Sequence, residues 1–254
     1  MSLLVERKGA VVTVIIDRPE RRNAVDFETG LALREAFDAF EKDSSAFVAV
    51  LTGAGGHFCA GFDLKAFAER GADYDPLGEG PMGPTRRLPS KPVLAAVEGY
   101  AVAGGMELAL WCDLRIAADN ATFGIFCRRW GVPLIDGGTV RLPRIVGQGR
   151  ALDLILTGRP VGAAEALSMG LADRVVPEGR ARAEAEALAA EIARFPQLCM
   201  NVDRLSAYRG WDADLRGALE AEATAGAAPL REGARDGAAR FARGLGRSGG
   251  FDEI

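Results

Sequence analysis

The chain has 254 residues, of which 48% are apolar and 26% are charged. These fractions are typical of an ordinary globular domain, so they exclude a disordered protein, a collagen-like chain and a small disulfide scaffold. The balance of 31 Lys and Arg against 35 Asp and Glu gives a net charge of −4. This charge argues against a nucleic-acid partner held by a general basic surface.

The N-terminus and the cysteines indicate the cellular compartment. The first residues become charged early and lack a long apolar stretch followed by a cleavage site, so no signal peptide is expected. The most apolar stretch, 93–112, contains Glu98 and Glu107 and is therefore not expected to span a membrane. The cysteines are widely spaced without a C-x-x-C pair, which favours a reducing compartment and makes the cytoplasm the expected location. They are Cys59, Cys112, Cys127 and Cys199.

The N-terminal half alternates strands and helices. β-branched and apolar runs predict buried strands over residues 11–16, 47–51 and 93–97. Between the first two, the apolar spacing of residues 27–42 predicts an amphipathic helix. This order favours an α/β fold.

The rest of the chain is expected to change from mixed to purely helical. A helix is predicted over 63–69, and the Gly- and Pro-rich segment 71–92 is predicted to be a mobile surface loop. A short helix over 106–111 precedes a strand over 113–117, and strands and helices alternate to about residue 176. From residue 178 onward the pattern is only helical, with breaks expected at Pro196, Gly210 and Pro229.

Three familiar motifs fail on inspection. The glycine-rich turn after strand 47–51 lacks the third glycine of a dinucleotide fingerprint, because Phe58 occupies that position. The segment Gly246–Gly250 matches G-x-S-x-G but has no strand before it and no histidine after it. His57 is the only histidine and is expected in an exposed turn, so histidine triads and two-histidine zinc sites are excluded.

Two glycine-flanked turns carry more information. The segments 58–65 and 99–108 each run from a turn into a predicted helix. Unpaired backbone N–H groups at such helix starts favour negative charge, and two of them converging on one oxygen would form an oxyanion hole. The plainer alternative for either turn alone is that its glycines only permit a tight bend.

Together with flanking motifs, these turns identify a family resemblance. Upstream lies Arg18-Pro19-x₃-Asn23-Ala24, and downstream lie Leu156-Thr157-Gly158-Arg159 and the run from Ala163 to Val175. In this order the motifs resemble the enoyl-CoA hydratase/isomerase (crotonase) superfamily over about residues 10–250.

The resemblance implies a fold, an assembly and a ligand. The expected fold is α/β, a crotonase-like spiral of ββα units with a helical C-terminal trimerisation region. The implied domains are a core over 1–195 and a helical region over 196–254. The implied assembly is a homotrimer or a hexamer built from two trimers, and the implied ligand is an acyl-CoA thioester.

The resemblance also implies the binding residues. The backbone N–H groups of Phe62 and Gly104 would hold the thioester oxygen, and Lys65 would lie near the CoA phosphates. The C-terminal Arg243 or Arg247 would replace a lysine that the family usually carries where this chain has Gly244. The remaining residues implied in substrate binding are Ala60, Gly61, Asp63, Leu64, Gly105 and Phe241.

Proton transfer is implied at two or three side chains. Glu107 matches the first catalytic glutamate of the family, and burial among apolar neighbours would raise its pKa. The second glutamate is replaced by Cys127, whose thiol is a poor group for activating water, so hydration by the natural protein is expected to be weak unless another carboxylate substitutes. Asp136 lies one position from where some relatives carry a catalytic aspartate and could substitute; the alternative is that it caps the next helix.

We therefore expect an acyl-CoA enzyme that hydrates a 2-enoyl-CoA without metal or redox cofactor. The alternatives are an enoyl-CoA isomerase or another enolate reaction with a single base, and an acyl-CoA-binding protein with little hydratase activity. Neither a nucleic acid nor a membrane is expected as a partner.

Overall fold

The computed structural model describes residues 2–71 and 74–246. The chain divides into two compact units, 1–190 and 191–254. Unit 1–190 contains the strands and most of the helices, and unit 191–254 is helical. The division falls in the last turn of α7, which spans Ala181–Ile192.

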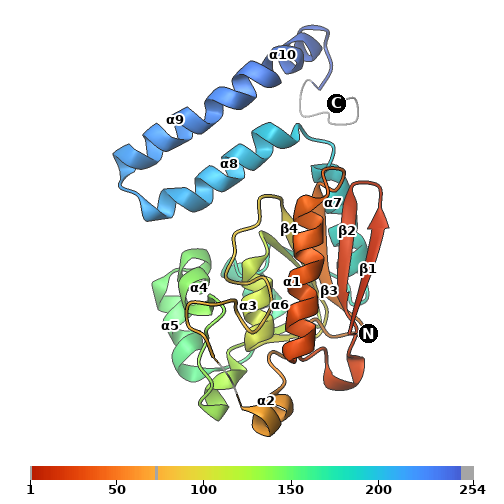
Figure 1. Ribbon diagram of the computed structural model, residues 1–254, viewed down its shortest axis with the longest axis vertical. Coiled ribbons are helices and arrows are strands. Elements are labelled where there is room, and N and C mark those ends of the chain that lie inside the picture. The colour runs from red at the N-terminus through yellow and green to blue at the C-terminus, as the bar shows by residue number, and fades with distance from the viewer. Residues whose placement is uncertain (1, 72–73, 247–254) are drawn as a thin grey trace. The chain divides into compact units, whose positions relative to one another are not determined.

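The strands of unit 1–190 form two sheets among the described residues (Figure 1). The larger sheet has the order β1-β2-β3-β4-β6-β9, in which β1 is antiparallel to β2 and all other pairs are parallel. The smaller sheet has the order β5-β7-β8. The strands are β1 (Leu3–Lys8), β2 (Val11–Ile16), β3 (Val48–Gly53), β4 (Val93–Val97), β5 (Tyr100–Val102), β6 (Leu114–Ala118), β7 (Thr122–Gly124), β8 (Val161–Gly162) and β9 (Arg174–Val176).

The helices complete a repeated ββα order along the chain. β1 and β2 precede α1, β4 and β5 precede α3, and β6 and β7 precede α4. In the last two repeats the first strand joins the larger sheet and the second joins the smaller one. The helices are α1 (Phe27–Lys42), α2 (Leu64–Arg70), α3 (Gly104–Trp111), α4 (Gly138–Val146), α5 (Gln148–Thr157), α6 (Ala163–Ser168) and α7.

β2 shows why its sequence is a continuous apolar run. All six of its residues are buried. Val12, Val14 and Ile16 belong to the main core, and α1 packs along β1 and β2 (Figure 1). On the alternate residues, the Thr13 hydroxyl donates to Glu186 of α7 at 2.9 Å. A strand covered on both faces cannot alternate apolar and polar residues.

The predicted elements of this unit are largely confirmed. The helix over 27–42 is α1, the strand over 93–97 is β4, and Asp63 is the N-cap of α2. The prediction for 71–92 is wrong in part, because residues 82–85 are buried. This stretch packs against α1 so closely that a Cβ on Gly83 would lie 2.9 Å from the Cβ of Leu33.

Unit 191–254 contains α8 (Gln197–Arg209), α9 (Leu215–Glu232) and α10 (Ala234–Ala242). The breaks predicted at Pro196 and Gly210 are confirmed at the two ends of α8. The break predicted at Pro229 is wrong, since α9 continues through it to Glu232. Proline costs the helix one N–H donor, and here this loss falls in the last turn. No helix in the described part of the chain is long and apolar enough to cross a bilayer.

Candidate active site

A cavity of about 600 Å³ lies within unit 1–190. Its walls come from α1, the turn before α2, α2 itself, the segment 74–82, the start of α3 and the segment 126–136. Seven of the sequence-predicted site residues line it. They are Ala60, Phe62, Leu64, Gly104, Glu107, Cys127 and Asp136.

The two glycine-flanked turns meet at this cavity. Gly61 has a φ of +99°, and a Cβ placed on it would lie 3.0 Å from the amide nitrogen of Gly104. Only glycine therefore fits at this contact. Neither the Phe62 amide nor the Gly104 amide donates a hydrogen bond to another group among residues 2–71 and 74–246. Two free N–H groups on adjoining turns beside one cavity are suited to bind a negatively charged oxygen.

Ala103 introduces strain directly before this helix start. It has φ +53° and ψ −124° at the N-cap of α3, a conformation that is costly for a residue with a Cβ. Its amide donates to the Gly124 carbonyl of β7 at 2.8 Å, and its own carbonyl accepts from Met106 and Glu107. These contacts hold the strained residue in place and so fix the start of α3.

Glu107 is buried in the first turn of α3, with a relative exposure of 3%. Its Oε1 accepts hydrogen bonds from the amides of Asp136 at 2.9 Å and Gly138 at 2.8 Å. No donor in the described part of the chain reaches Oε2. Burial, and next the charge of Asp136, raise the pKa of Glu107 to about 7. A carboxyl group with this pKa can both give and take a proton near neutral pH.

Asp136 is a second buried carboxyl group in the cavity wall. Its Oδ1 accepts from the Thr85 hydroxyl and from the Met82 amide at 3.2 Å. Burial raises its pKa, while the bond from Thr85 and the charges of Arg86 and Arg141 act in the opposite direction. The N-cap of α4 is Gly137, without a side-chain cap, so the alternative that Asp136 caps this helix is wrong.

Met82 and Thr85 are site-forming residues that the sequence reasoning missed. Both are fully buried, and Met82 also packs on the backbone of Gly104, since a Cβ there would meet its sulfur at 2.6 Å. Both lie in the segment predicted as a mobile loop. The available signal was an apolar residue, Met82, three positions before Thr85 within a run of Gly and Pro.

Cys127 lies in the 3₁₀ turn Phe126–Trp130 and lines the cavity with a relative exposure of 6%. Burial raises the pKa of its thiol, and the charge of Glu107 raises it further. The thiol is therefore in its neutral form near pH 7.

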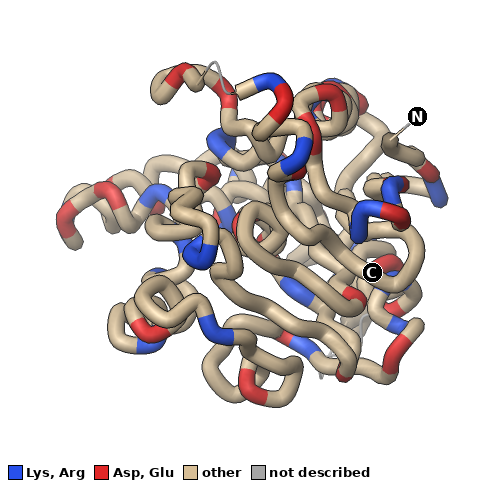
Figure 2. The backbone as a smooth tube through the Cα atoms, turned by 90° about the horizontal axis from the view of Figure 1, so that it is seen from below, with Lys and Arg blue, Asp and Glu red and all other residues tan. Residues whose placement is uncertain are grey.

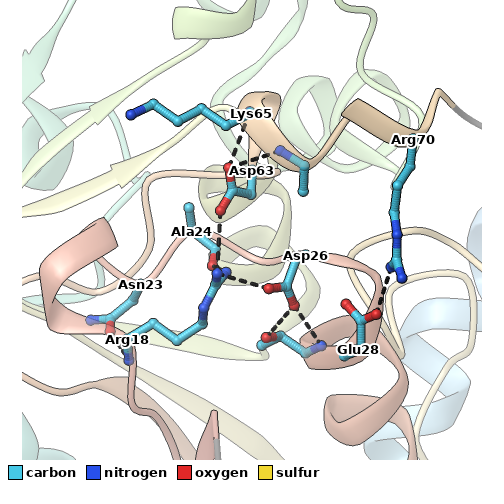
Figure 3. Close-up of polar contacts among 10 residues, drawn as sticks. Arg18, Asn23, Ala24, Asp26, Glu28, Asp63, Lys65 and Arg70 are labelled. Atoms are coloured by element: carbon cyan, nitrogen blue, oxygen red, sulfur yellow. Dashed lines mark hydrogen bonds and ion pairs between the residues drawn. The ribbon is translucent and has the colours of Figure 1, made fainter. Parts of the chain in front are cut away.

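Four other predicted binding residues lie outside the cavity lining. Gly61 and Gly105 allow close backbone packing; a Cβ on Gly105 would lie 2.1 Å from the Cys59 carbonyl oxygen. Asp63 accepts from the amides of Lys65 and Ala66 as the cap of α2. The Lys65 side chain is exposed and extends away from Asp63 (Figure 3).

The predicted C-terminal contacts belong to unit 191–254. Phe241 lies in α10 with 61% of its surface exposed, and Arg243 directly follows this helix. Arg247 lies outside the described residues. Basic and acidic residues are interspersed along the backbone (Figure 2), so any cation contacting an anionic ligand would do so locally.

Comparison with known proteins gives consistent matches. The sequence model of the enoyl-CoA hydratase/isomerase family matches residues 6–242. The chain is 42% identical over 193 residues to the enoyl-CoA hydratase EchA19 of Mycobacterium tuberculosis (strain ATCC 25618 / H37Rv), covering 73% of this chain and 72% of that protein. It is 40% identical over 202 residues to the carnitinyl-CoA dehydratase of Proteus mirabilis (strain HI4320), covering 78% and 77%.

The solved structures agree with the sequences. The crystal structure of the enoyl-CoA hydratase EchA1 from Mycobacterium marinum superposes with a TM-score of 0.89 at 35% identity, covering 95% of this chain and 96% of that one. A crystal structure of an enoyl-CoA hydratase from Mycobacterium tuberculosis H37Rv gives the same TM-score at 37% identity. The predicted spiral of ββα units is therefore confirmed as the fold.

Proposed function

We propose, on the premise that this chain belongs to the enoyl-CoA hydratase/isomerase family, that it adds water reversibly across the double bond of a 2-enoyl-CoA. Two of its relatives are an enoyl-CoA hydratase and a carnitinyl-CoA dehydratase, and these names describe the two directions of such a reaction. The observation that carries the proposal is the buried Glu107 carboxyl, with a pKa of about 7, in the same cavity as two free backbone amides.

The two amides would stabilise the charge that develops on the thioester oxygen. Addition of water to the β carbon pushes electrons through the conjugated system onto this oxygen. N–H groups already aimed at the oxygen stabilise that charge without reorganisation. We assign this role to the amides of Phe62 and Gly104. The Met82 side chain packs on Gly104 and would keep water away from the Gly104 amide.

The two carboxyl groups would divide the proton transfers. Asp136 accepts from Thr85 and is influenced by Arg86 and Arg141, so it is the better base for taking a proton from water. Glu107 would deliver a proton to the α carbon of the enolate. The two groups interact, and they would therefore titrate as a pair. This chemistry needs no metal or redox cofactor.

Cys127 stands, by the family resemblance, where the second glutamate is usual. Its neutral, buried thiol is suited to shape the cavity, and Asp136 would supply the missing carboxylate. In this proposal the second carboxylate comes from the same segment of the cavity wall, 126–136, so the cysteine at position 127 would not by itself weaken hydration.

The proposal extends to assembly and location. We infer that the helical unit supports a homotrimer, or a hexamer of two trimers, as the resemblance implies. All four cysteines are unpaired, and Cys199 is exposed, which fits a reducing compartment such as the cytoplasm.

Turnover of crotonyl-CoA tests the activity directly. The decrease in enoyl-thioester absorbance should be catalysed by the natural protein, with 3-hydroxybutyryl-CoA as product. Asp136→Asn should lower the rate by on the order of 10² to 10⁴, the usual contribution of one acid–base group. Binding of crotonyl-CoA without turnover would instead identify an acyl-CoA-binding protein, and formation of a shifted double bond from a 3-enoyl-CoA alone would identify an isomerase.

A further inference from the structure

Arg18 lies at the centre of a set of charged contacts (Figure 3), one of which joins it to Asp63, the residue after Phe62. Its side chain is only 15% exposed. The Nη2 atom lies 2.7 Å from Oδ2 of Asp26 and 3.3 Å from Oδ2 of Asp63, and Nη1 donates to the Ala24 carbonyl. One guanidinium therefore joins two separate segments of the chain, the turn 24–26 and Asp63, through two carboxylates and one backbone carbonyl.

Both carboxylates are helix caps. Asp26 accepts from the amide of Thr29 at the start of α1, and Asp63 accepts from the amides of Lys65 and Ala66 at the start of α2. Arg18 thus ties together the first turns of two helices that are far apart in sequence. Because the pairs are largely shielded from water, they are held more firmly than exposed ion pairs.

The Phe62 amide is held between these anchored points. The Val25 amide donates to the Gly61 carbonyl at 2.8 Å, and the Asp63 amide donates to the Val25 carbonyl at 2.8 Å. These two bonds fix the peptides on both sides of Phe62 and leave its own N–H free. Arg18 holds Ala24, which precedes Val25, and Asp63, which follows Phe62. Val25 and Phe62 are therefore each next to a residue that Arg18 contacts.

Asn23 fixes the backbone of Arg18 itself. This residue is fully buried and has a φ of +57°. Its Oδ1 accepts from the Arg18 amide at 2.9 Å, and its Nδ2 donates to the carbonyls of Ala54 and His57 at 2.8 and 2.6 Å. The backbone of Arg18 is thus held by hydrogen bonds, as its guanidinium group is held by ion pairs.

The two neighbouring cations, Arg70 and Lys65, do not join the starts of the two helices as Arg18 does. Arg70 pairs with Glu28 at 2.6 Å on the surface, and Lys65 extends away from Asp63 (Figure 3). From this geometry we infer that Arg18 is a positioning residue for the Phe62 amide: it aligns one of the two oxyanion donors by clamping the turn 24–26 to the start of α2. The inference rests on the proposed function, in which that amide binds the thioester oxygen.

The test uses a probe whose colour reports the oxyanion hole without turnover. A 2-enoyl-CoA conjugated to a dimethylaminophenyl ring shifts its absorbance to longer wavelength when hydrogen bonds polarise its thioester carbonyl. Arg18→Gln should bind CoA with unchanged affinity, reduce the red shift of the bound probe, and lower kcat for crotonyl-CoA on the order of 10²-fold, as loss of one oxyanion donor does. The Arg18→Lys protein should keep part of the red shift and part of the natural kcat.

Arg115 provides a matched control. It is also buried, and it pairs with Asp173 at 2.7 Å and donates to the carbonyls of Leu171 and Cys112, but it does not line the cavity. Arg115→Gln should lower the melting temperature as much as Arg18→Gln does, and at a temperature where it is folded it should keep the red shift and kcat.

Three outcomes overturn the inference, and one of them also concerns the proposed function. A folded Arg18→Gln protein with the natural red shift and kcat would show that the amide needs no such clamp. An equal loss in Arg115→Gln would show a merely structural effect. If the natural protein binds the probe without a red shift, the oxyanion hole itself is misassigned. If Arg18→Gln fails to fold, Asp63→Asn takes its place. This variant keeps the helix-cap acceptor but removes the ion pair between Asp63 and Arg18, and it must show a reduced red shift for the inference to stand.

Discussion

Burial of the Glu107 carboxyl has an energetic cost that depends on pH. Its pKa rises from 4.5 to about 7 in the folded chain, so the folded state binds more protons than the unfolded state between these pH values. The stability is therefore highest below about pH 4.5 with respect to this group and falls as the pH rises to 7. The same shift that costs stability gives the side chain its capacity for proton transfer.

The first prediction concerns the removal of this charge. Glu107→Gln should raise the free energy of unfolding at pH 8 by up to about 3 kcal/mol, since one pKa unit corresponds to about 1.4 kcal/mol. The amide oxygen can still accept from the two backbone donors. Urea unfolding at pH 8 and pH 4 is the measurement, and the difference between the proteins should vanish at the lower pH. A variant less stable than the natural protein at pH 8 would contradict the claim that burial of the ionised Glu107 carboxylate costs stability.

The second prediction concerns the coupling between the two carboxyl groups. The negative charge of Asp136 raises the pKa of Glu107, so Asp136→Asn should lower it. The limb of the kcat/KM profile near pH 7 should move to lower pH in the residual activity of this variant. An unmoved limb would mean that the two groups do not interact in the working enzyme.

The third prediction concerns Cys127. If Asp136 is the second acid–base group, Cys127→Ala should change kcat by only a few-fold, against on the order of 10² to 10⁴ for a lost acid–base group. Cys127→Glu should bring no gain, because it places a third carboxyl group beside Glu107. A large gain in crotonyl-CoA hydration from Cys127→Glu would instead restore the interpretation that the cysteine is a missing acid.

At the level of elements, the start of α3 combines strain with function. Ala103 holds a positive φ that costs on the order of 1 to 3 kcal/mol for a residue with a Cβ. The cost is offset because this conformation lets the Ala103 amide bond to Gly124 of β7 and lets its carbonyl accept from amides in the first turn of α3.

This strain yields the fourth prediction. Ala103→Gly should raise the free energy of unfolding by about 1 kcal/mol, the relieved strain less the added freedom of the unfolded chain. Ala39→Gly, on the exposed side of α1, is the control and should lower it by about 1 kcal/mol. Thermal or urea unfolding of both variants is the measurement. An equal decrease in the free energy of unfolding at both positions would show that Ala103 carries no strain.

The sequence predicts elements that local patterns encode. β2 follows from its continuous run of β-branched and apolar residues, α1 follows from its apolar periodicity, and the helix after Gly104 follows from its glycines and apolar run. β5, β7 and β8 have only two or three residues each, too few for a periodic signal. The segment 82–85 is ordered by contacts with residues more than fifty positions away, such as Asp136, which no local rule detects.

The same division holds for the site. Glu107 and the two turns could be predicted because they are defined by short motifs. The pairing of Asp136 with Thr85 could not, because it depends on where two loops meet in space. The choice between Asp136 as a helix cap and Asp136 as a site residue required the backbone geometry at Gly137.

At the scale of the whole molecule, unit 191–254 presents large apolar side chains. In α9 alone, Leu215, Leu219 and Leu230 are 77%, 55% and 70% exposed in the single chain. Exposed apolar side chains in such number favour burial against another surface.

The fifth prediction is therefore an oligomer. Light scattering at micromolar concentration should give the mass of three or six chains, and Leu219→Glu should lower it by placing a charge on α9. A stable monomer of the natural protein would contradict the proposed assembly, while leaving the chemistry of the cavity, whose lining lies entirely within residues 27–136, to be judged separately.

The central claim is that Glu107 moves a proton at the α carbon of a thioester polarised by two backbone amides. Its most direct test is the exchange of α protons of butyryl-CoA in D₂O, followed by mass spectrometry, because this saturated thioester cannot be hydrated. The account predicts deuterium uptake with the natural protein and with Asp136→Asn, and none above background with Glu107→Gln. Exchange that continues at the natural rate in Glu107→Gln would contradict it.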